Sequence, residues 1–171
     1  RWREALVAAQ AAQAAHKHNP KSHLAEEALL RCCERESWDE AAFALRKQRF
    51  WNHTRPDEWR ALLKAAEAAK QDLPALRREA EAMLIERESR PAPVRGWLQS
   101  HQRETGPVVS QRVQWLLLEN RVLDALAAVQ PPSACHPALL LELAKRLEAT
   151  HDAQAFALCD RVARHLTAQS G

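Results

Sequence analysis

Basic and aromatic side chains alternate in the segment Arg46–Pro56, RKQRFWNHTRP, where four cations surround the adjacent pair Phe50-Trp51. A groove for nucleic acid uses this combination, because cations bind phosphates and aromatic rings stack on bases. Arg60 and Lys64 follow, and the only acids nearby in sequence are Asp57 and Glu58. The segment therefore predicts a basic surface running from residue 46 to residue 64.

The same segment also suits the end of a helix. Cations are favoured there by the exposed carbonyl groups, and Phe50 continues an apolar face that begins at Phe43. We therefore expect the segment to have mainly a structural role. Its exposed charged and aromatic side chains could in addition bind a protein partner. The candidate partner-binding residues are Arg46, Lys47, Arg49, Trp51, Arg55 and Arg60.

Histidine and cysteine side chains can bind a metal, and the chain has 8 histidines and 4 cysteines. The histidines cluster at His16, His18 and His23, and Cys135 precedes His136. A closed zinc site needs four ligands, usually in pairs two to four residues apart, and the histidine cluster has no sulfur ligand beside it. We expect polar histidines at helix ends and buried thiols, with no metal and no cofactor.

Catalytic motifs are missing from the sequence. It contains no GxSxG, HExxH or EF-hand pattern, and its 3 glycines are too few for a phosphate-binding loop. Acid pairs such as Glu26-Glu27 stand beside arginines, as on a solvated helix surface. We expect no enzymatic activity, and an unrecognised active site remains the third alternative.

Composition favours a folded chain. Of its 171 residues 46% are hydrophobic and 27% charged, and the net charge of +3 gives no field that would attract nucleic acid. The cysteines have no disulfide-like spacing, which is typical of a reducing compartment. No apolar run is long enough to span a membrane, and the chain starts without methionine or a signal peptide. These features predict a fragment of a longer cytoplasmic protein.

The elements that carry these side chains are predicted to be helices. Alanine dominates runs such as VAAQAAQAA, and the β-branched and aromatic residues that favour strands are sparse. Proline and polar clusters divide the chain at regular intervals. The pattern predicts about ten helices, all-α, beginning near residues 2, 22, 37, 56, 74, 91, 107, 121, 137 and 152.

Two helices with their connections take about 33 residues, the size of a tetratricopeptide-like hairpin. A short repeat supports this, since DEAAFAL (Asp39 to Leu45) matches DAQAFAL (Asp152 to Leu158) at five of seven positions. We expect one domain over residues 1–171, built from stacked antiparallel hairpins as an α-solenoid. A single irregular helical bundle remains the alternative.

The burial of two aromatic residues follows from the repeat. Trp38 and Phe156 are expected at equivalent interhelical seams, with Ser37 and Glu40 forming a capping box before the first repeat segment. Periodicity places Phe156, Cys159, Val162, Ala163 and Leu166 on one side of the last helix.

A family resemblance is carried by WLLLENRVLDALAAV (residues 115–129) and by residues 136–171. They resemble the helical region of bacterial SWIM zinc-finger proteins, in which a leucine-rich helix, an R-x-x-D/E-A-L helix and an A-x-x-L-x-x-R helix recur in this order. The matching positions are Arg121, Asp124, Ala125, Leu126, Ala155, Leu158 and Arg161. The resemblance implies the helical part of a larger protein. The family's zinc motif, CxC followed by CxH, is absent, so zinc and nucleic-acid functions of that module do not transfer to these residues.

Regular helix pairing without catalytic residues predicts a non-enzymatic scaffold that binds a protein or peptide partner. The alternative function is nucleic-acid binding through the surface from Arg46 to Lys64. The sequence predicts no membrane partner and does not specify an oligomeric state.

Overall fold

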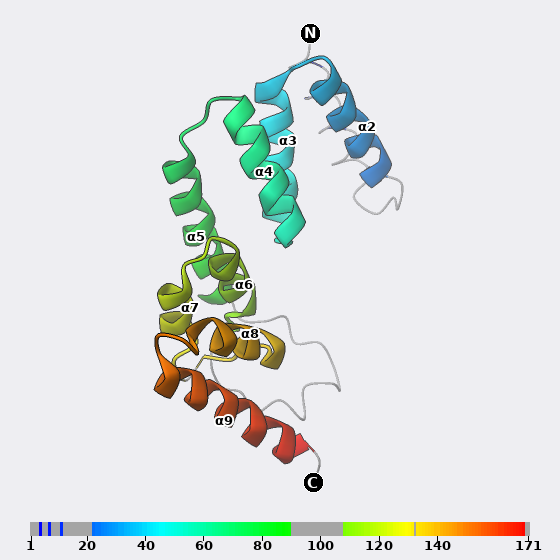
Figure 1. The fold of residues 1–171 in the computed structure, drawn as a ribbon. Helices are drawn as coiled ribbons and strands as arrows, with labels where there is room; N and C mark the ends of the chain where they lie inside the picture. The colour runs from blue at the N-terminus through cyan, green and yellow to red at the C-terminus, as the bar shows by residue number, and fades with distance from the viewer. Residues whose placement is uncertain are drawn as a thin grey trace. The chain divides into compact units, whose positions relative to one another are not determined.

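The computed structural model describes residues 22–89, 108–131 and 133–169, together with Glu4, Val7 and Ala11. This part of the chain is all-helical, which confirms the expected class (Figure 1). It holds eight helices rather than about ten, and the helices expected near residues 2 and 91 begin outside it. The helices are α2 (Ser22–Arg35), α3 (Asp39–Asn52), α4 (Pro56–Ala68), α5 (Leu73–Ser89), α6 (Ser110–Leu118), α7 (Val122–Ala128), α8 (Pro137–Leu147) and α9 (Asp152–Gln169).

The chain divides into two compact units, residues 1–79 and 80–171, which are called unit 1 and unit 2 below. In unit 1, α3 lies against both α2 and α4. The α2–α3 contact buries Leu30, Cys33, Ala41, Ala42 and Leu45. In α4 an apolar stripe with helical spacing buries Trp59, Leu62 and Ala66, and Leu63 stays half-buried.

Three connections share one left-handed turn, the Schellman motif, although its usual glycine is missing. After α2, the Trp38 amide donates to the Cys33 carbonyl at 2.8 Å. The corresponding bonds are Gln71 to Ala66 at 2.9 Å after α4 and Arg121 to Leu116 at 2.8 Å after α6. The residue before each donor has a positive φ: Ser37 (55°), Lys70 (51°) and Asn120 (56°). These turns stop each helix and satisfy carbonyls at its end.

In unit 2, α8 contacts α6, α7 and α9, and α7 also contacts α6. The buried residues of α8 are Leu140, Leu143, Ala144 and Leu147, a stripe with helical spacing. Leu141 points elsewhere and is 47% exposed. A β-bridge joins Val108 to Ala134, and the Val109 amide donates to the Ala134 carbonyl at 2.9 Å. The segment before α8 is thereby fixed to the start of α6.

The structure corrects the expected positions of two aromatic residues. Trp38 is 37% exposed, because α3 begins at Asp39 and Trp38 belongs to the preceding Schellman turn. Phe156 is 75% exposed, because α9 buries Ala155, Leu158 and Val162 and Phe156 projects about 100° away from Ala155. The prediction that both residues are buried at equivalent seams is wrong.

The expected capping box is also wrong. Ser37 adopts a left-handed backbone conformation, and the N-cap position of α3 is occupied by Trp38 without a side-chain hydrogen bond. Ser37 forms the left-handed turn that ends α2. Its backbone therefore cannot also adopt the N-cap conformation at the start of α3.

Candidate functional site

The first two cations of the segment Arg46–Pro56 are paired with carboxylates from other helices. Arg46 donates to Glu34 of α2 at 2.7 Å, and Lys47 donates to Glu79 of α5 at 2.7 Å. The Lys47 ammonium also lies 5.3 Å from the centroid of the Trp51 ring, within cation–π range. Both cations therefore hold neighbouring helices to α3.

Arg49 is bonded on two sides. It donates to Glu27 of α2 at 2.5 Å and to Glu58 of α4 at 2.8 Å, and its side chain is 29% exposed. The hydrogen bond from Arg49 lowers the pKa of the Glu27 carboxyl, and its bond to Glu27 raises the pKa of the guanidinium. Arg49 thus connects α3 to both α2 and α4.

The remaining predicted residues lie around the α3–α4 turn. Phe50 is buried, with its ring centroid 5.4 Å from Trp51 and 5.0 Å from Trp59, so it joins α3 to α4. Arg55 is exposed at the N-cap position of α4, and Arg60 pairs with exposed Asp57 at 2.9 Å.

The structure therefore gathers the six predicted residues around one end of α3 and the start of α4, but it neutralises most of their charge. The sequence places only Asp57 and Glu58 near these cations, whereas Glu27, Glu34 and Glu79 reach them from 12 to 32 residues away. Sequence proximity could not show those partners. These ion pairs link α3 to α2, α4 and α5.

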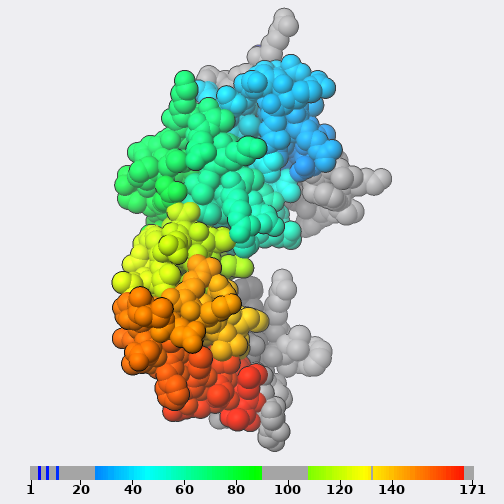
Figure 2. Space-filling model, viewed as in Figure 1, coloured from blue at the N-terminus to red at the C-terminus, as the bar shows by residue number. Residues whose placement is uncertain are grey.

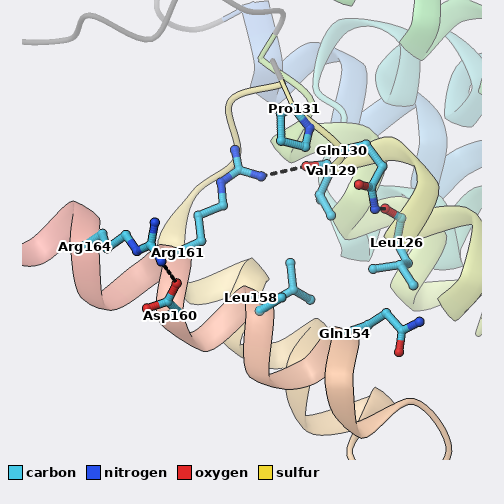
Figure 3. Close-up of a pocket in the computed structure, with 10 residues that line it drawn as sticks. Leu126, Val129, Gln130, Pro131, Gln154, Leu158, Asp160, Arg161 and Arg164 are labelled. Carbon is cyan, nitrogen blue, oxygen red and sulfur yellow. Dashed lines mark hydrogen bonds and ion pairs between the residues drawn. The ribbon is translucent and has the colours of Figure 1, made fainter.

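Unit 2 carries a feature that the sequence did not indicate, a groove of about 450 Å³ between the end of α7 and α9 (Figure 3). We call it the α7–α9 groove. Leu126, Val129 and Pro131 line one side, and Ala157 and Leu158 line the other. Its polar residues are Gln130, Gln154, Asp160, Arg161 and Arg164. An apolar floor with a few polar groups at its edge suits an apolar side chain of a ligand.

Arg161 fixes one wall of this groove. Its Nη1 donates to the Val129 carbonyl at 2.6 Å (Figure 3), and its Nη2 donates to the Ser133 carbonyl. Val129 follows the last residue of α7, so Arg161 caps a carbonyl at the end of that helix and also binds the loop at Ser133. Arg164 pairs with Asp160 at 2.6 Å and is 80% exposed, so it stays on the rim.

Arg146 of α8 makes the same kind of contact with α6, because its Nη1 donates to the Leu117 carbonyl at 2.6 Å. Leu117 lies in the last turn of α6. An arginine of α8 thus caps α6, and an arginine of α9 caps α7. The residues of the two pairs are separated by 29 and 32 positions in sequence.

Residues that carry the family resemblance also hold unit 2 together. Arg121 bonds to Asp124 at 2.6 Å and to Glu81 at 2.7 Å, and these bonds raise its pKa. Its guanidinium lies 5.7 Å from the Trp115 ring. Ala125 is fully buried. The sequence motifs include Arg121 and Arg161, whereas no sequence feature singled out Arg146.

The described part of the chain holds no group of three or more His, Cys, Asp or Glu side chains placed to bind a metal ion. The cluster His16, His18 and His23 lies outside the residues whose side chains are described. None of the described helices is long and apolar enough to cross a membrane.

The structure shows no disulfide among the four cysteines, all of which lie in its described part. Cys33 and Cys135 are buried as expected, and Cys32 and Cys159 are exposed, which corrects the expectation for those two. Burial raises the pKa of the Cys33 thiol.

Comparison of the chain with protein-family models, with curated proteins and with solved structures gives no match.

Proposed function

We propose that this chain is a non-enzymatic helical-repeat domain that binds a protein partner, and that the α7–α9 groove receives an apolar side chain of that partner. The observation that carries the proposal is the groove itself, open to solvent and apolar at its floor. A preformed groove of this kind lowers the cost of binding, because its walls need no ordering when the ligand arrives.

Stacked hairpins account for the arrangement of unit 2. α6 pairs with α7 and α8 with α9, while α8 also contacts α6 and α7. Arg146 and Arg161 repeat one cap between corresponding helices of the two pairs. A repeat in which each hairpin contacts the next one is how a solenoid builds its core and its binding surface. The tetratricopeptide-like architecture is part of the proposal.

Selection of 12-residue peptides from a displayed random library tests the groove. The expected result is a set of peptides that share an apolar anchor and bind the Ala157→Arg variant at least about tenfold more weakly, a difference of about 1.4 kcal/mol. Ala153→Arg is the matched control, because Ala153 is exposed on the same helix outside the groove. Peptides that bind both variants equally, or a library with no enrichment, would contradict the proposal.

Nucleic-acid binding has less support. Arg46, Lys47, Arg49 and Arg60 already pair with carboxylates, and phosphate binding would have to break those pairs. Binding of DNA or RNA that weakens steeply above about 50 mM salt would favour it over the peptide proposal.

The resemblance to the helical region of SWIM zinc-finger proteins supports one addition to the proposal, that the domain works beside a zinc module of a larger protein. The full-length sequence tests this directly. A full-length protein without CxC and CxH motifs would remove the addition and leave the groove proposal standing.

A further inference from the structure

One cation of the α7–α9 groove, Arg161, is bonded to carbonyl oxygens instead of a carboxylate. Its guanidinium donates to the carbonyls of Val129 and Ser133, and it makes no ion pair with any carboxylate in the described part of the chain. Arginine carries five N–H donors, so these two bonds leave others for a ligand. The groove therefore contains a half-buried positive charge that no anion among the described residues neutralises.

Four other half-buried arginines are neutralised within the fold. Arg46, Arg49, Arg112 and Arg121 each contact a carboxylate, at distances from 2.5 to 3.1 Å. Burial makes a charge costly unless polar groups or an opposite charge compensate it. Arg161 relies on carbonyl dipoles alone, so a carboxylate from a ligand would give it the pairing that the other four already have.

The rim of the groove does not supply that carboxylate. Asp160 pairs with Arg164 at 2.6 Å, and their side chains are 41% and 80% exposed (Figure 3). Together with Arg161, the residues that line the groove include two cations and one carboxylate, a net charge of +1. The attraction between this charge and an anion is stronger beside apolar walls than in open water, because the effective dielectric constant is lower there.

The lining residues of α9 follow one face of the helix. They are, in order, Gln154, Ala157, Leu158, Arg161 and Arg164, with an amide at one end and the cations at the other (Figure 3). The first and last are about 15 Å apart along the axis, a length that about five residues of an extended peptide cover. Arg161 lies about 4.5 Å beyond Leu158, within one or two residues of such a peptide. In Figure 2 the orange and red atoms of α9 form part of the surface in view.

We infer that the α7–α9 groove selects a peptide segment with an acidic side chain one or two residues from its apolar anchor. The anchor lies between Leu126 and Leu158, and the carboxylate accepts hydrogen bonds from Arg161. A side-chain carboxylate suits the groove better than the carboxyl end of a chain, because chain ends are bound by clustered backbone amides and the donor here is a side chain. The inference rests on the proposed function and adds the chemistry of its ligand.

Peptides enriched from the random library are the probes. Each is synthesised with a fluorescent label, together with an amide copy in which glutamine replaces glutamate and asparagine replaces aspartate. We expect acidic residues to be enriched within two positions of the anchor, and the amide copies to bind at least about threefold more weakly. Fluorescence anisotropy measures both affinities at about 50 mM and about 500 mM salt, and the difference should shrink at the higher concentration, because counterions screen the charges.

Two rim variants change the charge of the groove and keep Arg161 in place. The readout is the ratio of the affinities for an acidic peptide and its amide copy. Asp160→Asn raises the net charge by one, so the ratio should rise about two- to fivefold, and Arg164→Gln lowers the charge by one, so the ratio should fall by a similar factor. Arg161→Gln should remove the preference altogether, and circular dichroism checks its folding. If it does not fold, the two rim variants decide.

A blocked groove separates failure of this inference from failure of the proposed function. Ala157→Gln blocks it without adding charge, and Ala153→Gln is the matched control, because Ala153 is exposed on α9 outside the groove. Peptides that Ala157→Gln rejects but that bind equally well as amide copies would overturn the inference and leave the proposed function standing. A library with no enrichment, or peptides that bind Ala157→Gln unchanged, would overturn both. Self-association of the chain that Ala157→Gln abolishes would also overturn the inference, since a second copy would then occupy the groove.

Discussion

The guanidinium of Arg146 on α8 donates to the carbonyl oxygen of Leu117 on α6 at 2.6 Å, and Arg161 on α9 repeats this contact with Val129 after α7. A charged donor that satisfies a helix-end carbonyl forms a stronger hydrogen bond than a neutral donor. In unit 2 the same kind of arginine–carbonyl hydrogen bond thus joins α8 to α6 and α9 to the end of α7.

Replacement of Arg161 by alanine should destabilise unit 2 by about 1–3 kcal/mol, because two partly buried carbonyls lose their donor. Arg164→Ala is the control, since its pair with Asp160 is exposed and contributes no more than about 1 kcal/mol. Guanidinium denaturation followed by circular dichroism measures both. Equal losses from the two variants would show that the cap contributes nothing beyond an exposed ion pair.

Replacement of Phe50 by alanine should cost about 3–5 kcal/mol, because its ring lies between Trp51 and Trp59 and truncation leaves a cavity. Phe156→Ala should cost less than about 1 kcal/mol, since the side chain is 75% exposed. Unfolding free energies of the two variants decide this. A larger loss from Phe156→Ala would mean that the Phe156 side chain is buried in solution.

Lys70→Gly should stabilise unit 1 by about 0.5–1 kcal/mol, because Lys70 holds a left-handed conformation that disfavours any residue with a β-carbon. Asn120→Gly tests the same turn after α6 and should gain less, since asparagine tolerates this conformation better than lysine does. Thermal and chemical unfolding curves measure the shifts. A destabilised Lys70→Gly would show that the lysine side chain outweighs the backbone cost.

Acid should weaken the link between α2 and α3. The hydrogen bond from Arg49 lowers the pKa of Glu27 in the folded chain, so the ionised carboxyl favours folding above its unfolded pKa. Wild type should therefore be more stable than Glu27→Gln above about pH 5, and the difference should disappear as the pH falls from the unfolded pKa of about 4.3 through the lower folded pKa. Denaturation curves between about pH 3 and pH 7 measure it. A difference that does not vary with pH would exclude this carboxylate as its source.

The helix boundaries were largely predictable from local chemistry. Pro56 and Pro137 begin α4 and α8 as expected, because proline at the first helical position lacks only a donor that the helix leaves unpaired. Asp152 begins α9 as well. Such signals depend on only a few neighbouring residues, so they can be recognised in the sequence without knowing how the helices pack.

The environment of the side chains was much less predictable. Trp38 is exposed because a left-handed turn at Ser37 displaced the start of α3, and serine is not the residue that normally marks such a turn. The carboxylates that meet Arg46 and Lys47 lie 12 and 32 residues away, so only the packing of helices brings them together. The α7–α9 groove depends on the loop after α7, whose course no periodic pattern describes.

The nearest-neighbour pairing of helices in unit 2 has a kinetic consequence. Each helix closes against one that is adjacent or next but one in sequence, so the chain segments that must be brought together are short. The two arginine caps close loops of 29 and 32 residues, and the entropy lost in closing such loops grows only slowly with their length. Unit 2 should fold in about a millisecond or less, as helical proteins with local contacts do.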